Sequence, residues 1–400
     1  MRIGVYGGSF DPPHLGHVKA ALACKKELAL DKVLVIPANI PPHKTLASGG
    51  ACAQVRLELT KLAFSNLPGF EVLDLELRRD GKSYTVDTLR TLKAQYPKDD
   101  LFLMMGTDMF LSFQDWYCPA EIAKYARLVC FSRYDADEKN REALEKQAQA
   151  LQAAFGQKPV LLLNDCFDIS STEVRRLVFF GIAEPYLPAA VRSEIQLRGL
   201  YGAKLDAKGL PFEKLRELSL SLHKKTRVAH AEGVCETARE MAKRFGADEH
   251  LAARAGILHD VTKALNEAQQ LALAEKLGVQ LTDFERQNPQ LLHAKTGAAA
   301  ARTLFGECED VASAIEWHTT GKPDMTKLEK IVYLADMIEP DRSYPGVDEI
   351  RAAAERDLDE GTLLALKRTI AFLHEQGKAV CEDSSFALDF LLTERNSKQQ

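Results

Sequence analysis

Short apolar runs alternate with segments of helical periodicity through the first half of the chain. The apolar runs are rich in Val, Leu and Ile and cover residues 2–6, 32–37, 70–73, 101–105, 127–131 and 160–163. Helix-period segments separate them near 54–66, 84–96, 119–125 and 138–154, and a last helix is expected from Leu187 to about Gly199. Strands that alternate with helices in this way predict an α/β fold, a doubly wound parallel sheet with helices on both faces.

The pattern changes in the second half of the chain. From Phe212 onward helical periodicity dominates and no convincing alternating strand is present, which predicts an all-α domain. Charged residues, Gly and Pro gather in the short stretch between the two patterns, as is typical of a linker. We therefore expect a first domain over 1–202, a linker over 203–211, a helical domain over 212–395 and a frayed tail over 396–400.

Composition narrows the class of protein. The 400 residues are 46% hydrophobic and 27% charged, which is ordinary for a globular protein of two or three domains. A net charge of −5 argues against a nucleic-acid partner held by bulk electrostatics. No apolar run reaches about 18 residues, so no membrane span is expected. Eight scattered cysteines with no C-x-x-C pair, and no secretory leader, favour reduced thiols and a cytoplasmic location.

The strongest chemical signal follows the first predicted strand and reads Gly7-Gly8-Ser9-Phe10-Asp11-Pro12-Pro13-His14-Leu15-Gly16-His17. A strand, a glycine turn and a helix start in this order form an anion site, because the first N–H groups of a helix have no partner within it. His14 and His17 are one helical turn apart, so both rings can face the same anion. Neither a G-x-G-x-x-G nor a Walker pattern is present, which argues against a dinucleotide fold and a P-loop.

Three further motifs follow predicted strands or open a helix. Lys44 lies in a proline-stiffened loop after the second strand, and Gly106-Thr107-Asp108 follows the strand at 101–105. Ser171 and Arg175 stand at a helix start where they suit a triphosphate, although the same stretch also holds a capping box that needs no ligand. Because ligands of parallel sheets gather beyond the carboxyl ends of the strands, we expect these motifs to meet there.

The motif with two histidines resembles the signature of the nucleotidyltransferase superfamily that carries H-x-G-H. Together with Pro41-Pro42-His43-Lys44, Ser83 to Leu89, Gly106 to Asp108 with Trp116, and Ile169 to Arg175, it resembles bacterial nicotinate-mononucleotide adenylyltransferases over Met1 to about Tyr201. The resemblance implies a Rossmann-like sheet. It also implies transfer of the adenylyl group of ATP, with Mg²⁺, to nicotinate mononucleotide, which gives deamido-NAD and pyrophosphate. Whether nicotinate or nicotinamide mononucleotide is preferred is left open.

The same resemblance implies a role for each motif residue. The nucleotide loop would be lined by Gly7, Gly8, Ser9 and Phe10, and the ATP phosphates would contact His14 and His17. The mononucleotide phosphate would contact Lys44, the pyridine carboxylate would contact Thr85, and the pyridine ring would stack on Trp116. The adenosine ribose would contact Gly106 and Asp108, and the leaving pyrophosphate would contact Ser171 and Arg175. Catalysis would rest on His14, His17, Lys44 and Arg175. A packed core aromatic is the alternative interpretation of Trp116.

Seven of the ten histidines lie in the second half, and the strongest local signal there is His259-Asp260 at the end of an apolar helix. The order of His230, His259-Asp260, His293, His318 and Asp336 resembles the HD-superfamily phosphohydrolases, in particular the subgroup that hydrolyses diadenosine tetraphosphate symmetrically to two ADP. That resemblance covers about 212–395.

This second resemblance implies one or two divalent transition metals. His230, His259, Asp260 and Asp336 would bind one, and His293 and His318 would complete a second, with Asp260 bridging. Iron or manganese is favoured over zinc, because the set contains no thiolate. Lys263 and Arg342 would neutralise the polyphosphate, with solvated surface cations as the alternative, while His223, His250 and His374 are expected at the surface.

The leading hypothesis is thus a bifunctional enzyme that acts on small nucleotides, with no nucleic-acid or membrane partner, and it allows a homo-oligomer. Two alternatives for the second half stay open. It could be another nucleotide phosphohydrolase or phosphodiesterase, or a non-catalytic nucleotide sensor that regulates the first half.

Overall fold

The computed structural model describes residues 1–41, 50–133, 138–164 and 169–399. The chain divides into two compact units, Met1–Leu205 and Asp206–Gln400. The division falls within residues 203–211, the segment expected to be a linker. We call the two parts unit 1 and unit 2 and describe each by itself.

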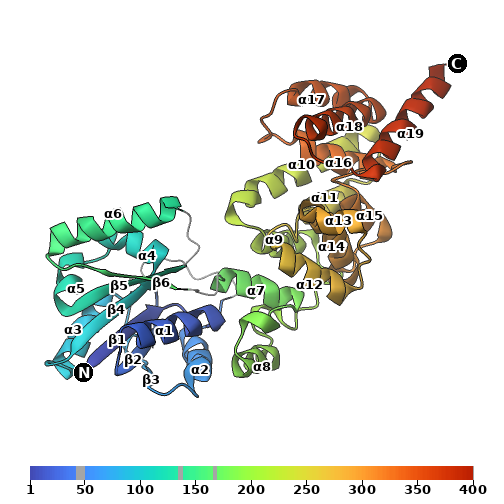
Figure 1. The fold of residues 1–400 in the computed structure, drawn as a ribbon. Helices are drawn as coiled ribbons and strands as arrows, with labels where there is room; N and C mark the ends of the chain where they lie inside the picture. The colour runs from blue at the N-terminus through green and yellow to red at the C-terminus, as the bar shows by residue number, and fades with distance from the viewer. Residues whose placement is uncertain (42–49, 134–137, 165–168, 400) are drawn as a thin grey trace. The chain divides into compact units, whose positions relative to one another are not determined.

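Unit 1 is built on a six-stranded parallel sheet of order β3-β2-β1-β4-β5-β6 (Figure 1). The strands are β1 (Arg2–Gly8), β2 (Lys32–Pro37), β3 (Phe70–Val72), β4 (Asp100–Gly106), β5 (Ala126–Arg133) and β6 (Val160–Asn164). Each corresponds to one of the six predicted apolar runs, which confirms the doubly wound α/β prediction. The order reverses at β1, because its neighbours β2 and β4 are reached by connections that run in opposite directions. Such a switch point leaves a crevice at the carboxyl ends of the strands.

Helices cover both faces of this sheet (Figure 1). They are α1 (Leu15–Glu27), α2 (Ala53–Phe64), α3 (Thr85–Gln95), α4 (Thr107–Leu111), α5 (Pro119–Tyr125), α6 (Glu138–Phe155), α7 (Ser171–Phe180) and α8 (Ala189–Arg198), with short 3₁₀ turns at Phe113–Asp115, Glu184–Tyr186 and Leu200–Gly202. Helix α8 ends at Gly199, which has φ of 64° and so adopts the left-handed conformation that favours glycine.

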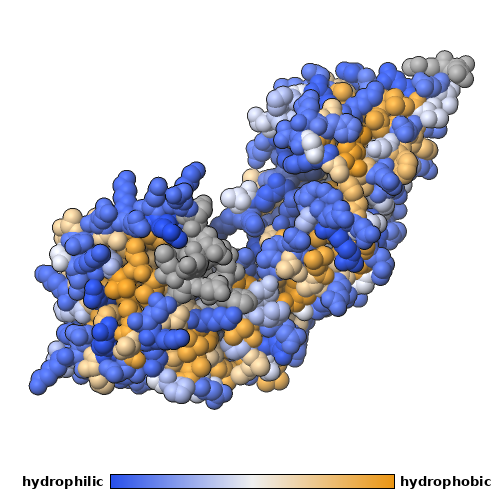
Figure 2. Space-filling model, in the orientation of Figure 1, coloured by the Kyte–Doolittle hydropathy of each residue, from blue (hydrophilic) through white to orange (hydrophobic). Residues whose placement is uncertain are grey.

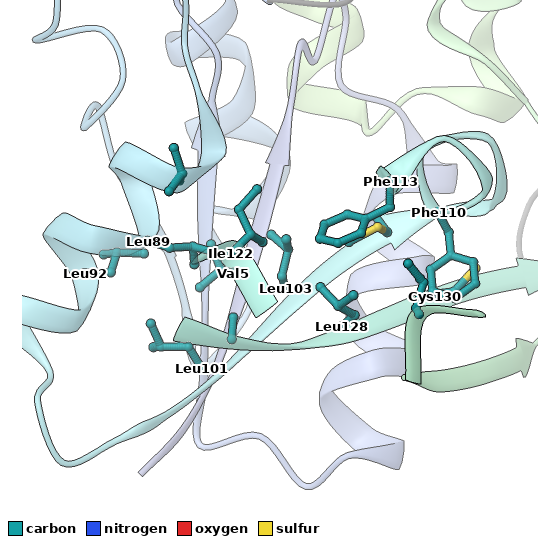
Figure 3. Packing of buried hydrophobic residues seen from close by; sticks show 14 of the residues in the cluster. Val5, Leu89, Leu92, Leu101, Leu103, Phe110, Phe113, Ile122, Leu128 and Cys130 are labelled. Carbon is teal, nitrogen blue, oxygen red and sulfur yellow. The ribbon is translucent and has the colours of Figure 1, made fainter. Parts of the chain in front are cut away.

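One hydrophobic core of unit 1 lies between the sheet and the helices α3, α5 and α6. Figure 3 shows strand residues such as Val5 and Leu103 facing Leu89 of α3 and Ile122 of α5 across this layer. All four side chains are at most 3% exposed. Burial of a side chain of this size stabilises the fold by about 1.5–3 kcal/mol, so the layer holds the strand ends in place.

Unit 2 is helical, and its described residues contain no strand. Its helices are α9 (Phe212–Leu222), α10 (Val228–Phe245), α11 (Glu249–Leu258), α12 (Glu267–Leu277), α13 (Asp283–Gln287), α14 (Leu292–Ala300), α15 (Glu309–Glu316), α16 (Lys327–Ile338), α17 (Val347–Arg356), α18 (Leu358–Glu375) and α19 (Glu382–Gln399). Short 3₁₀ turns lie at Lys225–Arg227 and Pro289–Leu291, and a π-helical segment at Ala301–Phe305. Residues 396–399, expected as a frayed tail, instead continue α19, whereas Gln400 lies outside the described residues.

The helices α10 and α11 pack with their backbones in close contact. A Cβ atom on Gly256 of α11 would lie 2.8 Å from the Cα atom of Cys235 on α10, so only glycine allows this approach. The contact brings His230 of α10 close to His259, which directly follows α11. Most of the visible protein surface is hydrophilic (Figure 2), and no helix of the described residues is long and apolar enough to cross a membrane.

Candidate active sites

The first candidate site lies in unit 1, in the turn between β1 and α1. A Cβ atom on Gly8 would lie 3.1 Å from the ring of Phe10, so a side chain at position 8 would force the loop to shift. Phe10 itself has φ of 47°, a backbone conformation that residues other than glycine rarely adopt. Its fully buried ring packs against Tyr6 and His17, with ring centroids 5.4 and 4.9 Å away, and this packing holds the strained backbone in place.

His14 and His17 lie together at the N-terminal end of α1, as the three-residue spacing predicts. Their ring centroids are 3.7 Å apart, and the backbone N–H of His14 donates to His17 Nδ1 at 3.2 Å. An Nδ1 atom that accepts a hydrogen bond leaves the proton of the neutral ring on Nε2. Burial lowers the pKa of His14 to about 3, so this ring is neutral at pH 7 in the ligand-free protein. The neutral His14 ring and the Nε2 proton of His17 therefore lie beside a helix N-terminus, a suitable environment for a phosphate.

A buried arginine holds this loop against its neighbours. Arg56 of α2 is fully buried and donates to the carbonyl oxygens of Ser9 at 2.6 Å, Asn39 at 2.8 Å and Ala51 at 3.3 Å. One guanidinium group thus joins the turn after β1 to the loop after β2. Nearby, Asp11 Oδ1 accepts from the backbone N–H of Ala51 at 3.0 Å and from the Tyr201 hydroxyl at 2.7 Å. Burial, followed by the charge of Asp11, raises the pKa of Tyr201, so the phenol stays a donor.

The N-terminal end of α7 contacts the same loop. Ser171 Oγ donates to the Pro12 carbonyl oxygen at 2.9 Å, and Arg175 Nη1 donates to the Asp11 carbonyl oxygen at 2.5 Å. The helix begins with the expected capping box of Ser170 and Glu173. Ser170 and Glu173 cap the helix while Ser171 and Arg175 contact the loop. The structure thus places Ser171 and Arg175 at the histidine motif.

The remaining predicted residues of unit 1 lie at neighbouring strand and helix ends. Gly106 precedes the first residue of α4, and Asp108 is exposed in the first turn of that helix. Thr85 is the first residue of α3. Trp116 is half-buried and packs against the core beside Phe113, with ring centroids 5.3 Å apart. Lys44, predicted to meet the mononucleotide phosphate, lies outside the described residues.

The second candidate site lies in unit 2, where five helices bring together the six predicted metal ligands. The residues and their elements are His230 of α10, His259 and Asp260 after α11, His293 of α14, His318 after α15 and Asp336 of α16. Their ligand atoms form three overlapping triads, each within 4.8 Å. The four histidines and Asp260 are at most 7% exposed. Residues more than a hundred positions apart in the sequence thus meet at one buried point.

The hydrogen bonds of the four rings determine which nitrogen atom faces the centre of the cluster. Each Nδ1 atom lies 2.6–3.0 Å from an oxygen atom that can only accept, so Nδ1 carries the proton of the neutral ring. The Nε2 atoms of His230 and His259 are 3.3 Å apart, and those of His293 and His318 are 3.2 Å apart. In both pairs two lone pairs face each other in a buried place, an arrangement that a cation between them would stabilise.

Asp260 lies between the two pairs. Its Oδ2 is 3.5 Å from His259 Nε2 and 3.8 Å from His230 Nε2, whereas its Oδ1 is 3.1 Å from His293 Nε2 and 3.6 Å from His318 Nε2. Burial acts to raise the pKa of Asp260, but the surrounding imidazoles outweigh burial and hold this pKa well below the usual range. The carboxylate is therefore ionised and presents one oxygen atom to each histidine pair. Nitrogen and carboxylate oxygen ligands in this arrangement fit one or two divalent metals.

Three cationic side chains surround the cluster. Arg227 contacts Asp260 Oδ2, Arg342 Nη2 lies 2.6 Å from Asp336 Oδ1, and Lys263 Nζ lies 2.9 Å from His293 Nε2. Lys263 and Arg342 are the two cations that the sequence pointed to, and the structure places both at the cluster. These cations can also contact a polyphosphate bound there.

Comparison with known proteins distinguishes the two halves. Residues 5–177 match the model of the cytidylyltransferase-like family. The probable nicotinate-nucleotide adenylyltransferase of Thermus thermophilus is 40% identical over 204 residues, which cover 50% of this chain and 100% of that protein. Its counterpart in Shewanella baltica is 37% identical over 221 residues, covering 51% and 99%. The N-terminal half belongs to the nicotinate-nucleotide adenylyltransferase family.

Residues 227–341 match the model of the HD domain. The symmetrical bis(5'-nucleosyl)-tetraphosphatase of Bacillus subtilis is 41% identical over 170 residues, which cover 42% of this chain and 90% of that protein. The C-terminal half is an HD domain. We therefore refer to an adenylyltransferase half and an HD half.

Arg56 and Tyr201 are residues of the adenylyltransferase half that sequence reasoning missed. A signal for Arg56 was available, because helical periodicity places it on the same buried face of α2 as Leu59 and Thr60. A cation on an apolar face needs acceptors within the protein. Tyr201 gave no such signal, since its contact with Asp11 joins residues 190 positions apart.

In the HD half, the surface prediction for His223 is wrong. This ring is 5% exposed, and its Nδ1 donates to the Ser219 carbonyl oxygen at 2.8 Å. The reason is the packing of α9, whose Ser219 hydroxyl donates to the Ile257 carbonyl oxygen of α11 at 2.6 Å. His250 and His374 are exposed, as expected.

Proposed function

We propose that the adenylyltransferase half transfers the adenylyl group of ATP to nicotinate mononucleotide. An oxygen atom of the mononucleotide phosphate attacks the α-phosphorus of ATP, the bond from this phosphorus to the bridging oxygen breaks, and pyrophosphate leaves. No covalent intermediate with the protein is needed, so positioning and charge stabilisation carry the catalysis. Mg²⁺ would enter with ATP and reduce the charge of its triphosphate.

The observation that carries this proposal is the pair of rings at the start of α1. The Nε2 proton of His17 can donate to an oxygen atom of the α-phosphate, where negative charge increases during transfer. Ser171 and Arg175 contact the backbone of the same loop at Pro12 and Asp11, where they would suit the leaving pyrophosphate. Thr85 and Trp116 lie at elements that would receive the pyridine ring, and an indole stacks well on a flat heterocycle.

The test of this proposal supplies the full chain with ATP and either nicotinate or nicotinamide mononucleotide. We expect release of one pyrophosphate per dinucleotide formed, with nicotinate mononucleotide preferred. Absence of pyrophosphate release with both mononucleotides would contradict the proposal, and a preference for the amide would correct the substrate.

We further propose that the HD half hydrolyses diadenosine tetraphosphate symmetrically. Water adds at one of the two central phosphorus atoms, the bond to the central bridging oxygen breaks, and two ADP form. His230, His259, Asp260 and Asp336 would hold one divalent metal, and His293, His318 and Asp260 a second. Bound there, the metals would make an attacking water more acidic and polarise the phosphoryl oxygen atoms. Arg227, Lys263 and Arg342 would hold the polyphosphate. The donor set favours iron or manganese over zinc, because it contains no thiolate.

The two oxygen atoms of Asp260, each facing a different histidine pair, carry this second proposal. The test measures ADP release from diadenosine tetraphosphate by the full chain loaded with Mn²⁺ or, under anaerobic conditions, Fe²⁺. The controls are the chelated protein and the Asp260→Asn variant, which removes the charge that the ligand set needs. Hydrolysis of other nucleotides alone would indicate another phosphohydrolase. Metal binding without hydrolysis of any nucleotide would indicate a sensor.

A further inference from the structure

The four histidines of the HD half do not all have the same partner at Nδ1. His259, His293 and His318 each donate to the backbone carbonyl oxygen three residues earlier, at 2.7, 2.8 and 2.6 Å. These bonds are local and use a neutral acceptor. His230 instead has its Nδ1 3.0 Å from Glu339 Oε1, a carboxylate 109 positions away in the sequence. One of the four rings is thus oriented by a charged group, and its partner is brought to it by the tertiary fold.

The surrounding structure holds the Glu339 carboxylate in place. It is 2% exposed, follows directly after α16, and its Oε2 accepts the backbone N–H of Asp341 at 2.7 Å. A Cβ atom on Gly233, three residues after His230 on α10, would lie 2.8 Å from this Oε2. The absence of a side chain at position 233 therefore leaves the space that the carboxylate fills beside His230.

A carboxylate partner changes the ligand strength of an imidazole. When it accepts the Nδ1 proton, it makes Nε2 a stronger base and stabilises the positive charge that the ring gains on binding a cation. A carbonyl oxygen also fixes the tautomer, but it carries only a partial charge. His230 Nε2 lies 3.1 Å from Asp336 Oδ1 and 3.3 Å from His259 Nε2, so the effect acts on the half of the cluster formed by these three residues.

We propose that Glu339 is a positioning residue that makes the two halves of the cluster unequal. The half with His230, His259 and Asp336 binds its divalent metal more tightly than the half with His293 and His318, because only the former contains a histidine backed by a carboxylate. The inference rests on the proposed metal site but not on the proposed substrate. It adds an order of loading, in which the half at His230 fills first.

The test measures Mn²⁺ binding to the metal-stripped full chain by calorimetry, which reports the number of bound ions and their separate affinities. The wild-type chain should bind two Mn²⁺ with unequal affinity. Glu339→Gln keeps the size and one acceptor of the side chain but removes its charge. It should weaken the tighter site about 10- to 100-fold, the range found for such outer partners, and change the weaker one less than about threefold.

A matched control and a second variant separate this role from general damage to the fold. Glu329→Gln removes an equally buried carboxylate from the other end of α16 and should leave both affinities within about threefold. Gly233→Ala keeps Glu339 but displaces its carboxylate, and it should weaken the tighter site as Glu339→Gln does. This variant adds no conformational cost to α10, because alanine favours a helix interior.

Several results would overturn the inference. These are fewer than two bound Mn²⁺, equal affinities in the wild-type chain, or the same affinity change at both sites in Glu339→Gln. A wild-type chain that binds two Mn²⁺ unequally but releases no ADP from diadenosine tetraphosphate would refute the proposed substrate and leave this inference intact.

Discussion

Replacement of Arg56 by methionine is the sharpest test of how the adenylyltransferase half is held together. The substitution keeps part of the apolar stem of the side chain and removes the three guanidinium nitrogen atoms that donate. It leaves the carbonyl oxygens of Ser9, Asn39 and Ala51 without the guanidinium, in a place where that group is fully buried. The loops after β1 and β2 would then be joined only by weaker contacts.

The size of the effect follows from these contacts. A hydrogen bond from a charged donor contributes about 1.5–3 kcal/mol, but the three bonds form one unit and their contributions do not add in full. Methionine also recovers some apolar burial. We therefore expect a loss of about 3–5 kcal/mol from the free energy of unfolding, which is less than the sum for three separate bonds. The KM values for ATP and the mononucleotide should both rise, because Arg56 connects the two loops.

The assay uses the two tryptophans of the chain, Trp116 in unit 1 and Trp317 in unit 2. In a Trp317→Phe background the fluorescence of Trp116 reports urea unfolding of unit 1 alone. Arg56→Met should lower the unfolding midpoint by about 1–2 M. Lys61→Met, which removes an exposed cation from the same helix, is the control. If the two variants have the same midpoint and the same KM values, the role of Arg56 in joining the two loops is refuted.

Three further predictions address the histidines and the helix contact. His17→Ala should lower the rate of adenylyl transfer at least about a hundredfold while unit 1 stays folded, and near-normal turnover would show that His17 takes no part in the reaction. Burial lowers the pKa of His223 to about 4 in the folded protein. Below pH 6.5 the unfolded chain therefore binds a proton that the folded chain does not, and the free energy of unfolding decreases as the pH is lowered. Between pH 6.5 and 5 this group alone should cost about 1.5 kcal/mol, and His223→Gln should flatten the fall, as Trp317 fluorescence in a Trp116→Phe background can measure. Gly256→Ala should push α10 away from α11 and lower both the stability and the Mn²⁺ content of the HD half relative to the wild-type chain. Urea unfolding followed by Trp317 fluorescence measures the stability, and elemental analysis measures the Mn²⁺ content; wild-type values for both would refute the role of this contact.

The sequence by itself determined the elements, and with them the class of each half. Alternation of apolar and polar positions is a local property, so the six strands and the intervening helices of unit 1 could be predicted from runs of a few residues. The histidine motif is equally local, because His14 and His17 are one turn apart on one helix. The candidate metal ligands of the HD half were predicted from the order of these residues in the chain and from the resemblance that this order carries.

Only the tertiary structure decided how distant polar groups pair. The contacts of Arg56 with Ser9 and of Tyr201 with Asp11 join separate segments, as does that of Glu339 with His230, and no periodicity records them. His223 was misplaced for the same reason, since its burial depends on the contact of α9 with α11. A buried polar group needs a hydrogen-bond partner, and the sequence can indicate this requirement. Which partner meets it depends on which helix ends the fold brings within 3 Å.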